Sequence, residues 1–297
     1  MESQELTPDL HVAEAGRLMM GQQLANILDY GQQVRANADM IAVHEMRKAI
    51  RRTFTSFKLF GPYFKRGKIK TYRRGLRRIM QRLGRSRDLA VFRLKLDTYN
   101  ESAERPLEDL CAYWQAQQTI GDDTLMRYLD KPKQQAFLEK YLCFTETPAL
   151  GVHPAVDPWV SYKIGHLAPV LIYQRVAAVR AFGDHLQSAS VKQLHRLRIQ
   201  FKELRYTLQF FEPLLGAEAE TVLVSLKQSQ EHLGDLNDAT VALRFLREVP
   251  GLEISVGRYY QYQQDEQQRL VHTFLPVWQG FDQPAWRQNL AAAMATL

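Results

Sequence analysis

The sequence has 297 residues and a mass of 34.4 kDa, which suits two domains of about 150 residues or one large fold. Hydrophobic residues make up 45% and charged residues 24%, a composition that excludes disordered and fibrous proteins. The apolar stretches are too short to span a bilayer, and the N-terminus lacks the basic and apolar regions of a secretory signal. Cys111 and Cys143 are too few for a disulfide framework, so we expect reduced thiols in a cytoplasmic protein.

The positive charge is concentrated in one segment. The formal net charge is +7, but residues 44–93 hold 17 Lys and Arg residues against two acids, Glu45 and Asp88, and so carry +15. The rest of the chain holds 22 basic and 30 acidic residues and carries −8. A basic run of this length repels itself unless an anion neutralises it. The sequence therefore predicts a polyanionic partner, with polyphosphate, nucleic acid and an anionic membrane as candidates.

Apolar residues recur at three and four positions along nearly the whole chain, a pattern that predicts an all-α fold. In the first half, helices are predicted over residues 10–35, 39–60, 66–84, 88–100, 106–120 and 132–145. In the second half, helices are predicted over residues 157–183 (with Pro169 inside), 190–211, 217–233, 237–248, 252–278 and 283–296. Residues 145–158 contain three prolines and a glycine and are interpreted as a linker between two units, residues 1–147 and 155–297.

The two halves resemble each other. Residues 43–47 match residues 194–198 at an offset of 151, and residues 83–88 match residues 233–238 at an offset of 150. Two matches in the same order indicate an internal duplication. We therefore expect each half to be a helical bundle.

Basic residues form a stripe on one flank of the apolar face of the second helix in each half, and the third helices repeat the pattern. A further set lies about 140° to 200° round the helices, where we expect greater exposure and a contribution to the same positive field. The stripe residues are His44, Arg47, Arg51, Lys58, Lys70, Arg73, Arg77, His195, Arg198, Lys202, Arg205 and Lys227. The further set is Lys48, Arg52, Arg74 and Arg78.

Two interpretations of the stripes are open, ordinary surface salt bridges or anion binding. The first stripe has almost no acid three or four positions away, and Glu45 and Glu203 lie on the other side of their helices. Arg and Lys side chains without a counter-charge leave their donors for phosphate oxygens, which favours a polyanion site. The placement of the stripes beside the apolar faces predicts a groove between packed helices.

The two histidines occupy the same place in each repeat. Each is a candidate donor to phosphate, and a structural role is the open alternative. A metal site would require further ligands on the same helix face. The neighbours there are Arg47 and Arg198, so we expect no metal ligation.

The Leu-Gly-x-x-Arg/Asn-Asp segments of the repeat have the character of structural elements. Gly84 and Gly234 suit helix ends or close helix contacts, and Asp88 and Asp238 are predicted to cap the following helices. The basic stripes lack interleaved aromatic residues suited to stacking bases, which weakens an interpretation as a single-stranded nucleic-acid-binding protein.

At these positions the sequence resembles the CHAD (conserved histidine α-helical domain) family. The resemblance rests on His44-x-x-Arg47-x-x-x-Arg51 and Leu83-Gly84-x-x-Arg87-Asp88, then on His195-x-x-Arg198-x-x-x-Lys202-x-x-Arg205-Tyr206 and Leu233-Gly234-x-x-Asn237-Asp238. It implies two homologous helical bundles related by a pseudo-twofold. It also implies binding of long-chain inorganic polyphosphate in a basic central groove, with targeting to polyphosphate granules. The stripe residues would then line that groove.

Members of the family are often fused to a triphosphate tunnel metalloenzyme domain, whose strands carry alternating glutamates. This sequence lacks that pattern, so we expect a stand-alone binding module without catalytic residues or cofactors. Two other classes remain open, a nucleic-acid-binding protein and a metal-dependent polyphosphate-processing enzyme. An enzyme of that kind needs clustered carboxylates for its metal ions, and the basic segment offers two acids.

Overall fold

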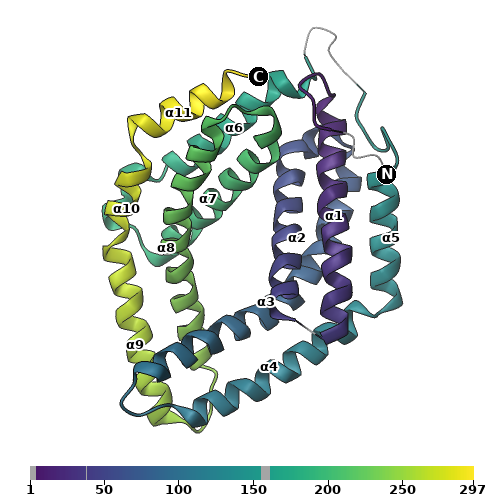
Figure 1. The fold of residues 1–297 in the computed structure, drawn as a ribbon. Coiled ribbons are helices and arrows are strands. Elements are labelled where there is room, and N and C mark those ends of the chain that lie inside the picture. The colour runs from purple at the N-terminus through teal and green to yellow at the C-terminus, as the bar shows by residue number, and fades with distance from the viewer. Residues whose placement is uncertain (1–4, 38, 155–160) are drawn as a thin grey trace.

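The computed structural model describes residues 5–37, 39–154 and 161–297, and the elements in these ranges are helices (Figure 1). The first half contains α1 (Val12–Asn37), α2 (Met40–Phe60), α3 (Arg66–Ser102), α4 (Glu108–Leu129) and α5 (Pro132–Glu146). The second half contains α6 (Ile164–Arg180), α7 (Val191–Phe211), α8 (Glu218–Leu246), α9 (Glu253–His272), α10 (Phe274–Phe281) and α11 (Pro284–Met294). The prediction of an all-α fold is confirmed.

The two helices that carry the main basic stripes begin at polar caps. The Asp39 carboxylate accepts a hydrogen bond from the Ala42 backbone N–H at 2.9 Å at the start of α2. At the start of α7, Ser190 and Gln193 form a reciprocal capping box. These side chains satisfy backbone donors that a helix leaves unpaired in its first turn, and so they fix where each stripe begins.

The helix breaks predicted just after Gly84 and around Gly234 are wrong, because α3 and α8 each continue through that glycine without interruption. Asp88 and Asp238 lie in the interiors of these helices and cap nothing, which corrects their predicted role. A glycine inside a helix costs about 1 kcal/mol relative to alanine, which tertiary packing outweighs here. Gly84 allows a close approach, since a Cβ at this position would lie 2.9 Å from the Arg47 guanidinium. Around Gly234 the space is open.

The long helix predicted over residues 252–278 is divided at Thr273 into α9 and α10. Pro276 explains the division, because its ring would clash with the carbonyl of residue 272 in a continuous helix. Pro169 lies inside α6, as predicted. The helix predicted over residues 157–183 begins as α6 at Ile164, and its residues 157–160 lie outside the described part of the chain.

Two apolar clusters join the halves. The larger one takes buried residues from both halves, and the Phe60 and Phe211 rings at the ends of α2 and α7 lie 6.3 Å apart. The smaller one joins α3 and α4 to α8 and α9, with the ring of Phe92 5.7 Å from that of Tyr259. As a result, α2 lies against α7 and α3 against α8.

The two predicted units, residues 1–147 and 155–297, and their pseudo-twofold relation stay predictions. The last residues of the predicted linker, 155–158, lie outside the described ranges. In those ranges no helix is both long and apolar enough to cross a bilayer.

Candidate anion-binding groove

A cavity of about 290 Å³ lies between α2 and α7, with α3 and α8 contributing one residue each. We call it the groove. Its lining residues are His44, Arg47, Lys48 and Arg51 of α2, Arg87 of α3, Arg198, Lys202, Arg205, Tyr206 and Gln209 of α7, and Gln230 of α8. Eight of these have basic side chains, and none of the described acidic residues lines the groove. The cavity therefore has the composition of an anion site.

Helical spacing explains why these side chains converge. Residues three and four apart share one face of a helix, so His44, Arg47 and Arg51 project from α2 in one direction. The same holds for Arg198, Lys202 and Arg205 on α7, which are four and three residues apart. Packing of α2 against α7 then brings the two stripes to a single cavity.

Arg47 and Arg198 are the most deeply buried cations of the groove, with 9% and 6% of their surface exposed. Burial, reinforced by the nearby charge of Arg51, lowers the pKa of each guanidinium to about 10. Both therefore stay charged at neutral pH. The Arg47 guanidinium donates to the Met80 carbonyl at 3.4 Å and lies 3.9 Å from the Asp88 carboxylate.

Lys202 is the most strongly perturbed group in the groove. Burial lowers the pKa of its ammonium to about 6, and the charges of Arg51, Arg198 and Arg87 act in the same direction. Lys202 is consequently mostly neutral at pH 7 when no anion is bound. An anion in the groove would reverse the electrostatic part of this effect and favour the protonated form.

Both histidines have lowered pKa values. Burial is the main cause for His44 and also for His195, where Arg198 adds to the effect. Both rings are therefore neutral at pH 7 in the empty protein. The Nδ1 atom of His195 lies 3.1 Å from the Asn237 side-chain oxygen, so the ring is held by its neighbour in the repeat motif.

Three acids contact cations of the groove without lining the cavity. The Glu45 carboxylate accepts a hydrogen bond from the Lys48 ammonium at 2.9 Å. Arg87 donates to Asp238 at 3.2 Å and to Asp88 at 3.3 Å, and thereby connects α3 to α8. These two carboxylates offset part of the positive charge from outside the cavity. Arg87 itself lines the groove, yet it was absent from the predicted site; its place in the Leu-Gly-x-x-Arg-Asp motif is the signal that could have found it.

Polar side chains also connect α2 and α7 directly. Lys58 of α2 forms an ion pair with Glu203 of α7, which also pairs with Arg175 of α6 at 3.2 Å. The expectation that Lys58 lacks a counter-charge is wrong, because the acid comes from another helix. Arg52 donates to Gln209 at 3.0 Å.

Several predicted residues lie elsewhere than expected. Lys48 lines the groove and the Arg52 guanidinium lies 5.7 Å from the centre of the Tyr206 ring, so neither is directed away from the groove as expected. The five predicted cations of α3 are exposed and lie outside the cavity: Lys70, Arg73, Arg74, Arg77 and Arg78. Lys227 is also exposed and lies 3.7 Å from Glu231. The site residues that the structure brings together are thus seven of the sixteen: His44, Arg47, Lys48, Arg51, Arg198, Lys202 and Arg205.

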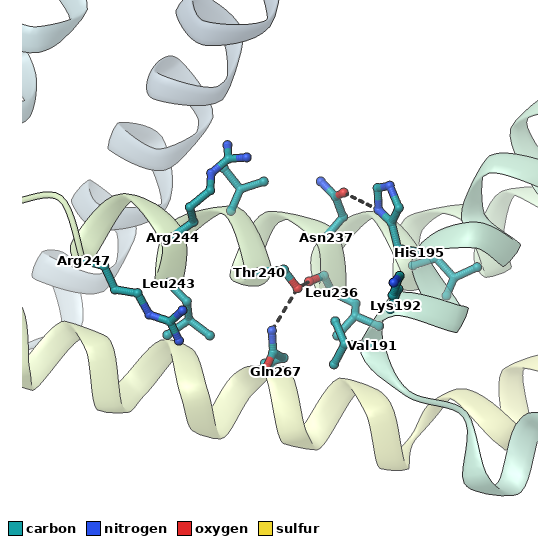
Figure 2. A pocket seen from close by; sticks show the side chains of 12 residues that line it. Val191, Lys192, His195, Leu236, Asn237, Thr240, Leu243, Arg244, Arg247 and Gln267 are labelled. Atoms are coloured by element: carbon teal, nitrogen blue, oxygen red, sulfur yellow. Dashed lines mark hydrogen bonds between the residues drawn. The ribbon is translucent and has the colours of Figure 1, made fainter.

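His195 borders a second cavity next to the groove. This cavity holds about 600 Å³ between the start of α7, α8 and α9, and we call it the side cavity (Figure 2). Leu236, Thr240 and Arg244 of α8 line it, and Figure 2 shows the hydrogen bond between His195 and Asn237 at its edge.

Comparison with known proteins places the chain in a family. A model of the CHAD domain matches residues 18–247, more than half of the chain. The chain belongs to the CHAD family. The predicted family is confirmed, and the matched span contains α2, α3, α7 and α8, the four helices that line the groove.

Solved structures agree on the fold of this CHAD-family chain. It is similar to the CHAD domain from the plant Ricinus communis, with 22% sequence identity, a TM-score of 0.70 and coverage of 98% of this chain and 95% of that chain. It is also similar to PptA from Streptomyces chartreusis, with 15% identity, a TM-score of 0.62 and coverage of 91% and 100%. A search of curated proteins gives no match. At these identities the structural likeness concerns the fold alone.

Proposed function

We propose that this CHAD-family chain binds long-chain inorganic polyphosphate in the groove, without catalysing a reaction on it. The observation that carries the proposal is the convergence of eight basic side chains on a cavity that no described acid lines. Arg47 and Arg198 stay charged although they are buried, which costs desolvation free energy. Charge-assisted hydrogen bonds to a bound polyanion would offset this cost.

The composition of the groove favours binding over catalysis. Among the described residues, no three His, Cys, Asp or Glu side chains lie together as metal ligands would. Of the acids beside the groove, Asp88 and Asp238 accept hydrogen bonds from Arg87, and Glu45 accepts one from Lys48. Two-metal phosphoryl chemistry needs carboxylates that are directed at the substrate, so these acids do not supply it.

Polyphosphate also fits the groove better than nucleic acid does. Tyr206 is the aromatic residue that lines it, and the Arg52 guanidinium already lies over that ring. Stacking of bases requires free aromatic faces along a basic path. A narrow polyanion that presents phosphate oxygens on every side makes fuller use of guanidinium and ammonium donors.

The test is a fluorescence titration of labelled long-chain polyphosphate, with tripolyphosphate, duplex DNA and single-stranded RNA as competitors. The double variant Arg51→Glu and Lys202→Glu removes two groove cations. The control, Arg74→Glu with Arg78→Glu, reverses two cations on the exposed face of α3; its charge change is at least as large, because Lys202 is mostly neutral in the empty groove. Two lost charge-assisted contacts of about 1.5–3 kcal/mol each predict at least a hundredfold loss for the groove variant. Long-range charge alone predicts a loss of affinity in the control at least as large as in the groove variant, and that result would refute the groove as the site.

Two further measurements complete the test. Incubation of the wild type with polyphosphate and Mg²⁺ or Mn²⁺ is expected to release no orthophosphate above the blank; metal-dependent turnover would overturn the non-catalytic proposal. In cells that store polyphosphate, we propose that a fluorescent fusion gathers at the granules. The groove variant should stay dispersed while the α3 control still gathers there.

A further inference from the structure

The side cavity differs from the groove in its chemistry. Five apolar residues form its walls, and four cationic or imidazole side chains border it. The apolar residues include Leu233, Leu236, Val241 and Leu243; the basic ones are Lys192, His195, Arg244 and Arg247. Its volume of about 600 Å³ lies in the range of small-molecule sites, about 300–1,000 Å³. A bare polyphosphate chain would leave the apolar walls without a partner.

The two cavities are neighbours along one face of α7. His195 lines the side cavity, and Arg198 and Lys202 line the groove, at spacings of three and four residues. At 1.5 Å of rise per residue, residues 195 and 202 are about 10 Å apart along the helix, a length that a few linked phosphates cover. One ligand can therefore place an organic group in the side cavity and its phosphates in the groove.

Polar side chains on the side-cavity wall indicate what the organic group is. The Gln267 amide donates to the Thr240 hydroxyl at 2.9 Å, and Asn237 holds His195 from the same wall (Figure 2). The Gln267 side-chain oxygen has no hydrogen-bond partner among the described residues, and a hydrocarbon tail would cover it without pairing it, which costs free energy. A nucleobase and ribose offer both a flat apolar surface and hydrogen-bonding edges.

We propose that the side cavity binds the nucleoside of a nucleoside polyphosphate whose phosphates enter the groove at His195 and Arg198. This inference rests on the proposed function of the groove as a phosphate site. It adds a second ligand class that competes with polyphosphate for Arg198 and Lys202.

The first test compares two ligands with three phosphates each on the wild-type protein by calorimetry. Inorganic tripolyphosphate carries at least as much charge as ATP, so electrostatics alone predicts that it binds as tightly or more tightly. Contact of the nucleoside with the apolar walls should reverse this order and make ATP about tenfold tighter. Equal or weaker binding of ATP would overturn the inference.

Variants then locate the organic group. Thr240→Phe fills the side cavity, and Thr221→Phe introduces the same ring on an exposed part of the same helix as a control. We expect Thr240→Phe to reduce ATP affinity to that of tripolyphosphate, with polyphosphate binding and the control unchanged. If Thr240→Phe loses helicity, Gln267→Leu serves instead and should remove the preference for ATP by loss of the amide. Equal weakening of ATP and tripolyphosphate would overturn the inference.

The outcomes separate this inference from the function on which it rests. Loss of all polyphosphate binding in the wild type would refute the groove itself. Intact polyphosphate binding without a preference for ATP would refute the nucleoside site alone. Farnesyl diphosphate, a lipid diphosphate, is the third ligand in the comparison. If it binds more tightly than ATP, and Thr240→Phe removes that difference in affinity, the side cavity holds a lipid and not a nucleoside.

Discussion

Polyphosphate affinity should fall as pH rises, because binding requires Lys202 to take up a proton. In the empty groove, burial and the charges of Arg51, Arg198 and Arg87 lower the pKa of this lysine to about 6. A row of phosphates beside the ammonium would favour its charged form and raise the pKa again. The internal phosphates of the chain are strong acids and do not titrate in this range, so the proton goes to the protein.

The size of the effect follows from the pKa values. If the bound form has the ordinary lysine value of 10.5, affinity falls about tenfold per pH unit above pH 6. Between pH 6 and pH 8 the loss is about fiftyfold, or about 2.3 kcal/mol. A bound anion favours the protonated forms of His44 and His195 as well, so proton uptake by these rings adds to the slope.

Calorimetry at pH 7.5, in buffers that differ in ionisation enthalpy, measures the proton uptake directly. We expect about one proton per groove for the wild type. Lys202→Arg is the matched variant, since a guanidinium stays protonated and should flatten the pH profile while binding more tightly at pH 8. Absence of proton uptake, or the same slope in both proteins, would refute the reasoning.

Three further predictions concern stability and charge. The unfolded chain keeps a proton on Lys202 up to about pH 10.5 while the folded chain has lost it above about pH 6, so the free energy of unfolding should rise with pH in this window. Thermal melts at several pH values check this, and Lys202→Met should raise the melting temperature at pH 7 and remove the rise. Glu203→Gln releases the cations paired with it and should tighten polyphosphate binding a few-fold at low salt but not at high salt; unchanged affinity at low salt would contradict this. Gly234→Ala, in open space inside α8, should stabilise the fold by about 0.5–1 kcal/mol in denaturant titrations. In Gly84→Ala the new Cβ would lie 2.9 Å from the Arg47 guanidinium, so this substitution should displace the guanidinium and weaken polyphosphate binding. Identical effects of the two alanine substitutions would count against this close contact.

The sequence by itself determined the helical fold and the place of the basic stripes. The spacing of apolar residues and the helix caps depend on residues close together in the chain, so they can be recognised in the sequence without knowledge of the tertiary contacts. The angle between a stripe residue and the apolar face is fixed by the helix itself, so the direction of Arg47, Arg51 and Arg198 could be predicted. Lys48 was expected to be directed elsewhere and lines the groove as well. The repeat of the motif also pointed to the family.

Tertiary structure decided which stripes meet and what charge they carry. Lys58 is paired because packing brings Glu203 to it from another helix, and no spacing within α2 could show this. Arg87 enters the groove because α3 continues through Gly84, where close packing against Arg47 outweighs the local preference for a break. The exposed cations of α3 lie outside the groove, because the packing of the helices leaves their side of α3 facing solvent.

The protonation state of Lys202 depends most fully on the tertiary structure. Its pKa of about 6 arises from burial and from charges on α2, α3 and α7 together. Desolvation and Coulomb energies depend on distances between helices, and a sequence pattern contains no such distances. A lysine that appears in the sequence as one more positive charge is, in the folded and empty protein, mostly neutral at pH 7.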